Sequence, residues 1–375
     1  MDQFVADGAA EIAARAGREL EALVGISSPS GDVDGAEEAI ALCAAFLPPQ
    51  AEIERVPCST PGSADDLVAR IAGRGSRRLL LLGHVDTVIE HSSHMPLRHD
   101  GDRLYGPGTV DMKGGVVLAL GVARTLAPRP DAFAEVTVLL VTDEEWRRHE
   151  FVHVERFGSY DACLCFEGGQ LTPDGDEGVV VRRKAAGTVR VLATGRASHS
   201  GTAPDQGRNA LLALAATATE IASRHDPSGP ERLSVVPTVI RSGDAFNVVP
   251  AEGELLFDLR ADRSEAFDAV CAAVPGELDG VGLETKMLRI WPGMDSQAAT
   301  RILLERAGAK LGRPIIGSPR GGASDASHFA PHIPLTVDGL GPRGGGAHTP
   351  EEFVLAPSLH TRAEVALAVA ATVLD

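Results

Sequence analysis

Three short apolar runs, each ending in charged or histidine side chains, place the strongest constraint on how this chain folds. The runs are RRLLLLGHVDTV, EVTVLLVTDEE and YDACLCFEGG, and a helical stretch, KGGVVLALGVARTL, separates the first two. Buried strands that alternate with helices form a mainly parallel sheet covered on both faces. The sequence therefore predicts an α/β fold built on such a sheet.

The middle of the chain follows a different pattern. Between residues 186 and 292 the order is strand, helix, strand, strand, helix, strand, with segments GTVRVLATG, NALLALAATATEIAS, LSVVPTVIRSG, NVVPAEGELLFDLRA, EAFDAVCAAV and GLETKMLRIW. This β-α-β-β-α-β order is typical of a ferredoxin-like α+β domain. A chain of 375 residues is long enough for two domains. We expect residues 1–185 and 293–375 to form the first domain, with 186–292 inserted as the second.

Charge and composition exclude several classes of partner. A formal net charge of -17 argues against nucleic acid, because phosphate binding needs a basic surface. No apolar stretch reaches the length of a membrane span, and the acidic N-terminus lacks the basic and apolar regions of a secretory signal. The five cysteines have no metal-finger spacing, so we expect reduced thiols. These features predict a cytoplasmic protein without a nucleic-acid or membrane partner.

Side chains of the types that commonly bind metals follow all three apolar runs. His84 and Asp86 follow the first run, Glu144 and Glu145 the second, and Glu167 the third. One acidic residue after a strand is commonly a helix cap or a solvated turn. Repetition at three strand ends favours a shared crevice, since ligands of open α/β sheets bind outside the carboxyl ends of strands. Imidazole with carboxylate suits zinc, and also cobalt or manganese.

Two further carboxylates belong to this predicted crevice. Side chains two apart on a strand point the same way, so Asp86 can accept a proton from the His84 ring and fix its tautomer without binding metal itself. The segment GPGTVDMKGG, residues 106–115, matches neither the dinucleotide-binding nor the Walker pattern. We expect Asp111 to point into the crevice, with the glycines permitting a close backbone approach.

The order of these motifs along the chain is specific. H-x-D is followed by D-M-K-G-G, D-E-E, F-E, G-R-A-S-H-S-G and G-G-G-A-H-T-P-E-E. This order resembles the M20 metallopeptidase family, and within it the glutamate carboxypeptidase branch. The resemblance covers nearly the whole chain, including the inserted domain.

The resemblance implies a site for two divalent metal ions, with zinc favoured and cobalt or manganese as alternatives. Asp111 would bridge the two ions. His84 and Glu167 would complete one ligand set, and Glu145 and His348 would complete the other.

Glu144 is implied as the general base that activates a metal-bridging water. The reaction would be hydrolysis of a peptide or N-acyl-amino-acid amide bond next to a free carboxylate. Two metals can lower the pKa of a bound water from about 15.7 to about 7 and polarise the scissile carbonyl, so no protein nucleophile is required. Ser198, Ser200 and Ser324 lie near histidine or aspartate, but nothing around them resembles a nucleophile elbow.

The inserted domain carries three further residues that match the family. His199 is implied to reach the active site of a partner subunit and stabilise the oxyanion, which makes the domain a lid and the site of homodimerisation. Arg260 and Asn247 match positions that hold the substrate, and the fork of arginine suits a carboxylate. A surface ion pair with Asp258 or Asp262 is the alternative for Arg260.

One departure from the family pattern concerns the substrate. After Asp143-Glu144-Glu145 the family usually continues with a small, Gly-Ser-like turn, whereas this chain has Trp146-Arg147-Arg148-His149. These bulky residues should change the wall beside the metals. His91 and His94 have a spacing that could bind metal on a helix, but the surrounding Ser and Pro favour an exposed loop.

Two other functions stay open at the level of sequence. An N-carbamoyl or allantoate-type amidohydrolase would have a similar site and a different substrate. A non-catalytic binding protein with the same fold would be expected to lack the base or a metal ligand, and this sequence has Glu144 and all five ligands.

Overall fold

The computed structural model describes residues 1–375, which divide into two compact units. The first unit comprises Met1–Arg182, Asp295–Arg320 and Ser324–Asp375, and the second comprises Arg183–Met294 and Gly321–Ala323. The insertion expected at 186–292 lies inside the second unit.

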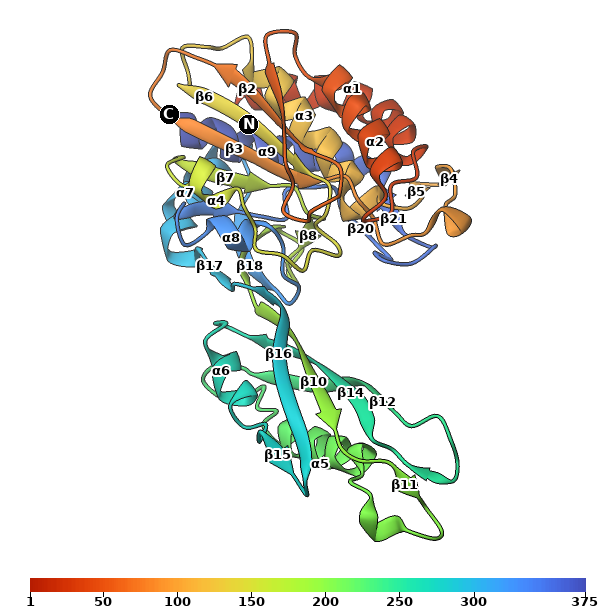
Figure 1. The fold of residues 1–375 in the computed structure, drawn as a ribbon. Helices are drawn as coiled ribbons and strands as arrows, with labels where there is room; N and C mark the ends of the chain where they lie inside the picture. The colour runs from red at the N-terminus through yellow and green to blue at the C-terminus, as the bar shows by residue number, and fades with distance from the viewer. The chain divides into compact units, whose positions relative to one another are not determined.

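The first unit is built on a six-stranded sheet in the order β1-β2-β6-β3-β7-β19. Its strands are β1 (Glu52–Val56), β2 (Asp66–Ala72), β3 (Arg78–His84), β6 (Glu135–Val141), β7 (Ala162–Cys165) and β19 (Leu335–Val337). β6, β3, β7 and β19 are parallel to one another, while β1 and β2 add an antiparallel edge. Figure 1 shows β2, β6, β3 and β7 as neighbours in this order. The expectation of a mainly parallel α/β sheet is confirmed.

Both faces of this sheet are buried, which explains the uninterrupted apolar runs. Leu79 and Leu81 of β3 belong to the core formed with the long helices, and Leu80 and Leu82 point the other way and are equally inaccessible. On that second face the short helix α8 contacts β7 and β19. Alternate residues of a strand face opposite sides, so a strand covered on both sides has no polar face. The helices of this unit are α1 (Gln3–Val24), α2 (Val33–Phe46), α3 (Gly114–Leu126), α4 (Val154–Phe157), α7 (Gln297–Leu311), α8 (Ala326–Phe329) and α9 (Ala356–Leu374).

Two smaller sheets complete the first unit. One has the order β17-β9-β18, with β8 also paired to β9, and the other has the order β20-β21-β5-β4. Their strands are β4 (Arg98–Asp100), β5 (Arg103–Tyr105), β8 (Gln170–Leu171), β9 (Glu177–Arg183), β17 (Met294–Asp295), β18 (Ile315–Arg320), β20 (Gly344–Gly345) and β21 (Phe353–Leu355). Pairing of β21 with β5 brings the C-terminal part of the chain beside the loop that precedes α3. None of the helices combines the length and apolar character needed to cross a membrane.

The second unit contains a five-stranded antiparallel sheet in the order β12-β14-β10-β16-β15. Its elements are β10 (Ala185–Thr194), β11 (Ser198–His199), α5 (Ala210–Ala222), β12 (Ser234–Ser242), β13 (Val248–Val249), β14 (Glu252–Ala261), α6 (Ala266–Cys271), β15 (Glu277–Leu278) and β16 (Val281–Trp291). The long elements follow the expected β-α-β-β-α-β order. The strand expected from Asn247 to Ala261 is interrupted at Pro250, which has no N–H to donate to a ladder.

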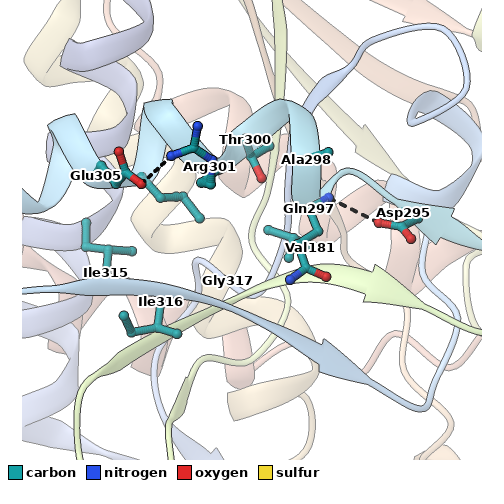
Figure 2. Close-up of a pocket in the computed structure, with 11 residues that line it drawn as sticks. Val181, Asp295, Gln297, Ala298, Thr300, Arg301, Glu305, Ile315, Ile316 and Gly317 are labelled. Carbon is teal, nitrogen blue, oxygen red and sulfur yellow. Dashed lines mark hydrogen bonds and ion pairs between the residues drawn. The ribbon is translucent and has the colours of Figure 1, made fainter.

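A cleft of about 600 Å³ opens between α7, β9 and β18 in the first unit (Figure 2). Its floor is mainly aliphatic, and it contains neither histidine nor cysteine. Its acidic side chains are already paired, Asp295 with Arg182 and Glu305 with Arg301. The cleft therefore has no unpaired carboxylate, imidazole or thiol.

A buried arginine fixes the turn that follows β19. Arg362 of α9 is fully buried and donates hydrogen bonds to the carbonyl oxygens of Gly339 and Gly341, the latter over 3.1 Å. It also donates to Glu177 Oε2 over 2.9 Å. One guanidinium on α9 thus satisfies polar groups of the turn after β19 and of β9.

Replacement of Arg362 by methionine should destabilise the protein severely. Two carbonyls and part of a carboxylate would lose their donor in the interior, so we expect the free energy of unfolding to fall by about 3–5 kcal/mol. Urea unfolding followed by circular dichroism measures this change. Arg306→Met, which removes an exposed arginine whose side chain is 58% accessible, is the control and should change stability by less than about 0.5 kcal/mol. Equal effects of the two substitutions would contradict this role for Arg362.

Candidate metal centre

The carboxyl ends of three parallel strands bring the predicted ligands together. His84 is the last residue of β3, Glu144 and Glu145 lie just beyond β6, and Glu167 lies just beyond β7. β3 lies between β6 and β7, so the three strand ends are adjacent. The structure therefore brings the predicted ligands at these strand ends close together in the first unit.

Two groups of potential ligands share Asp111. In the first group, His84 Nε2 lies 3.2 Å from Asp111 Oδ1 and 3.7 Å from Glu167 Oε1. In the second group, His348 Nε2 lies 3.1 Å from Asp111 Oδ2 and 3.2 Å from Glu145 Oε2. The two oxygens of Asp111 therefore face different histidines, as a bridging carboxylate requires.

The spacing and chemistry of these atoms fit divalent metal ions. Ligands at about 2.0–2.1 Å from a tetrahedral zinc ion are separated by about 3.3 Å, close to the separations found here. His84 Nδ1 lies 3.0 Å from the backbone oxygen of Asp86, which can only accept, so Nδ1 carries the proton. His84 Nε2 is then the ring nitrogen that faces Asp111 Oδ1, and it would bind a metal ion after losing its proton.

The charges around the second group of ligands also favour a bound cation. Hydrogen bonds with Asp111 and Glu145 raise the pKa of His348 to about 11. The surrounding carboxylates thus attract a positive charge to the atom that would bind metal, and a metal ion would displace that proton. His348 also has a φ of 66°, a left-handed conformation that is uncommon for residues other than glycine and is typically retained at functional sites.

A buried carboxylate, Glu352, shapes the loop that presents Asp111. Its oxygens accept hydrogen bonds from the backbone N–H groups of Gly108, Val110 and Asp111 over 2.7–2.9 Å. Gly108 has a φ of 75°, which favours glycine there. This role of Glu352 was missed at the level of sequence, although the residue stands in the H-T-P-E-E motif.

The expected close approach of the glycine backbone is also found. A Cβ atom on Gly115 would lie 1.8 Å from the carbonyl oxygen of Phe166, so only glycine lets the start of α3 reach the residue that precedes Glu167. The glycine-rich segment therefore serves packing around Asp111.

Asp86 supports both the histidine and the loop after β6. Its Oδ1 lies 3.3 Å from His84 Nδ1, in line with the expected fixing of the ring. Its two oxygens also accept hydrogen bonds from the backbone N–H groups of Glu144 and Glu145, each over 3.1 Å. Asp86 thereby ties the end of β6 to the end of β3.

Glu144 is buried beside the ligands without belonging to either group. Burial raises the pKa of the Glu144 carboxyl well above its ordinary value; the charge of His84 opposes this rise, and the negative charge of Asp325 adds to it. A buried carboxyl group next to the metal ligands is placed to take a proton from a bound water and release it again.

Three predicted site residues belong to the second unit. His199 is exposed on β11, and its Nδ1 accepts hydrogen bonds from the N–H groups of Gly201 and Thr202 over 3.1 and 3.2 Å. Asn247 is also exposed. Its backbone oxygen accepts a hydrogen bond over 3.0 Å from the N–H group of Ser200, the residue after His199, so His199 and Asn247 lie near each other within this unit.

The guanidinium of Arg260 is paired with Asp258 through contacts of 2.9 and 3.1 Å. This is the ion pair that the sequence left open as the alternative for Arg260. A role in substrate binding therefore requires the guanidinium to exchange Asp258 for a ligand carboxylate, or to bind both.

The histidines at 91 and 94 lie outside both ligand groups. His91 is exposed in a single turn, η1 (His91–Ser93), where its ring contacts Ser27 and Asp32. The interpretation as an exposed loop fits His91, whereas His94 is partly buried.

The segment Trp146-Arg147-Arg148-His149 has two distinct parts. Trp146 is half exposed, whereas Arg147 is completely buried and paired with Asp143 and Asp325. The sequence marked this segment as unusual, but nothing in it showed that Arg147 would be inside the protein.

Comparisons with known proteins show the family of this chain. The model of Peptidase family M20/M25/M40 matches residues 80–372. Carboxypeptidase G2 from Pseudomonas sp. (strain RS-16) is 30% identical over 355 residues, which cover 88% of this chain and 82% of that protein. A succinyl-diaminopimelate desuccinylase from Stenotrophomonas maltophilia is 29% identical and covers 78% of this chain and 83% of its own length.

The fold is shared with solved structures. The M20 family metallo-carboxypeptidase Sso-CP2 from Sulfolobus solfataricus has a TM-score of 0.74 and 16% identity, covering 95% of this chain and 98% of its own. The aminopeptidase PepT from Bacillus cereus has a TM-score of 0.76 and 18% identity, covering 97% of this chain and 99% of its own. With a family match over most of its length and a relative 30% identical, the chain belongs to peptidase family M20/M25/M40 and is a metallohydrolase of that family.

Proposed function

We propose that this protein hydrolyses the amide bond of a peptide or N-acyl amino acid next to a free carboxylate, using two divalent metal ions. The observation that carries the proposal is the position of Asp111, whose two oxygens face His84 and His348 in two adjoining ligand groups. Zinc fits these ligands best, with cobalt or manganese as alternatives. The names of the relatives, a carboxypeptidase and a desuccinylase, support an amide bond beside a carboxylate.

Glu144 would carry the proton in this reaction. When bound, two metal ions would make a water acidic and polarise the scissile carbonyl. Glu144 lies beside the ligand groups without being in either of them, and Asp86 holds its backbone N–H. It can therefore take a proton from the attacking water and deliver it to the leaving amine.

Residues of the second unit would bind substrate and stabilise the oxyanion. Because His199 Nδ1 accepts two backbone hydrogen bonds, its proton is on Nε2, which is a donor suited to an oxyanion. We propose that His199 acts in the site of a partner subunit, so that the enzyme works as a homodimer with the second unit as lid. Arg260 and Asn247 would hold the substrate carboxylate and the polarised oxygen.

Metal analysis with a substrate panel tests the proposed reaction. Mass spectrometry of the purified protein should find about two metal ions per chain. Amino acids should be released from dipeptides or N-acyl amino acids only in the presence of zinc, cobalt or manganese. Hydrolysis restricted to N-carbamoyl substrates would select the carbamoyl amidohydrolase instead, and metal binding without turnover would favour a binding protein. Absence of metal binding would contradict the dinuclear site.

Mixing two inactive variants tests the role of His199. Glu144→Gln lacks the base and His199→Ala lacks the oxyanion donor, but a mixed dimer contains one complete site if His199 acts across subunits. Unfolding and refolding an equal mixture should give about a quarter of wild-type activity, since half of the dimers are mixed and each has one working site. Activity no higher than that of the separate variants would show that His199 does not act in the partner.

A further inference from the structure

One guanidinium joins the loop that carries Glu144, just beyond β6, to a part of the first unit that is distant in sequence. Arg147 Nε and Nη2 donate to Asp143 Oδ1 over 3.0 and 2.8 Å, and Nη2 donates to Asp325 Oδ2 over 3.0 Å. Nη1 donates to the other oxygen of Asp325. The side chain of Arg147 is 0% accessible, and each carboxylate is only 3% accessible. This is a buried pair of carboxylates bridged by one planar cation.

Each of the two carboxylates bridged by Arg147 is also connected to a further segment of the first unit. The second oxygen of Asp143 accepts a hydrogen bond from Thr60 N–H over 2.9 Å, which ties the end of β6 to the loop after β1. Asp325 begins the short helix α8, and Ser324 beside it donates to Asp338 over 2.6 Å. The guanidinium of Arg147 also lies over the Phe151 ring, with its Cζ 4.6 Å from the ring centre.

The bridged carboxylates flank Glu144. Asp143 precedes Glu144 in the chain, and the charge of Asp325 acts on the Glu144 carboxyl. Without a cation, two buried carboxylates beside the base would repel it and each other. Arginine suits this place because its fork binds two carboxylates at once, whereas the ammonium group of lysine cannot span both.

We propose that Arg147 is a positioning residue: by clamping Asp325 to Asp143 it holds α8 against the end of β6 and keeps Glu144 in its working geometry. This inference rests on the proposed function, in which Glu144 is the base. It assigns a role to the segment that replaces the family's small turn, since a small residue there could not form the clamp.

Kinetics of Arg147 variants separate positioning from other roles. In Arg147→Ala we expect kcat to fall about 100-fold, as for a catalytic group displaced by about 1 Å, with KM and metal content close to wild type. Arg147→Lys should recover part of the loss, and millimolar guanidinium added to Arg147→Ala should raise kcat where urea does not. Arg74→Ala, which breaks an exposed ion pair with Asp131, is the control and should leave kcat unchanged.

The contrary outcomes are distinct. In Arg147→Ala, a rise in KM at unchanged kcat would assign Arg147 to substrate binding. Loss of metal would show instead that Arg147 supports the metal ligands. Either result, or a wild-type kcat, would overturn the inference. If Arg147→Ala does not fold, Arg147→Met/Asp325→Asn keeps the charge balanced and should show the same fall in kcat.

Hydrogen–deuterium exchange tests the clamp even if no substrate is turned over. In Arg147→Lys, backbone amides of residues 324–329 should exchange about tenfold faster than in the wild type, while those of α9 stay unchanged. Faster exchange in an enzyme inactive on every substrate would support the clamp and reject only the proposed function. Unchanged exchange in 324–329 would overturn the clamp itself.

Discussion

Replacement of Glu144 by glutamine should abolish turnover while leaving the metals in place. The glutamine amide has nearly the same shape but cannot take a proton from water or deliver one to the leaving amine. General acid–base catalysis contributes about 10²–10⁴-fold, so kcat should fall by about 1,000-fold or more. Because Glu144 belongs to neither ligand group, the metal content should stay at the wild-type value. Steady-state kinetics and metal analysis of the same preparation measure both quantities.

A glutamate six residues further along the same loop provides the control for this substitution. Glu150 is exposed and has no part in either ligand group, so Glu150→Gln should retain wild-type kcat and metal content. A Glu144→Gln variant with wild-type kcat would reject Glu144 as the base. Loss of metal together with activity would instead make Glu144 a ligand.

Replacement of Asp111 by asparagine should have the largest effect on metal binding. The carboxylate faces both histidines, so its loss removes a charged ligand from both groups at once. Substitution of residues that only support a ligand weakens binding about 10–100-fold, and loss of a shared ligand should exceed about 100-fold. Competition with a zinc chelator measures the affinity, and turnover should disappear at metal concentrations that saturate the wild type.

Two variants distinguish a bridge from two separate sites. Asp100→Asn, at an exposed position on β4, should leave metal binding unchanged. Glu167→Gln should weaken one metal while the other keeps most of its affinity, since Glu167 belongs to one group only. If Asp111→Asn also lost just one metal, the bridging role would be rejected.

The sequence predicted the structure correctly where the order of strands and helices along the chain determines their arrangement in space. The apolar runs ending at His84, Glu144 and Glu167 predicted parallel strands, and the carboxyl ends of adjacent parallel strands meet without further information. The same reasoning gave the β-α-β-β-α-β order of the second unit. Pro250 broke one expected strand for a local reason that the sequence also contained.

Contacts between residues far apart in the chain were decided only by the tertiary structure. Glu352 accepts from Gly108 and Asp111, more than two hundred positions away, and Arg147 binds Asp325 across 178 positions. Neither partner choice leaves a periodic or compositional signal, because a buried polar contact depends on which groups packing leaves facing each other. The sequence by itself thus determined the fold class and the residues at the strand ends. Packing decided which buried charges hold those residues in place.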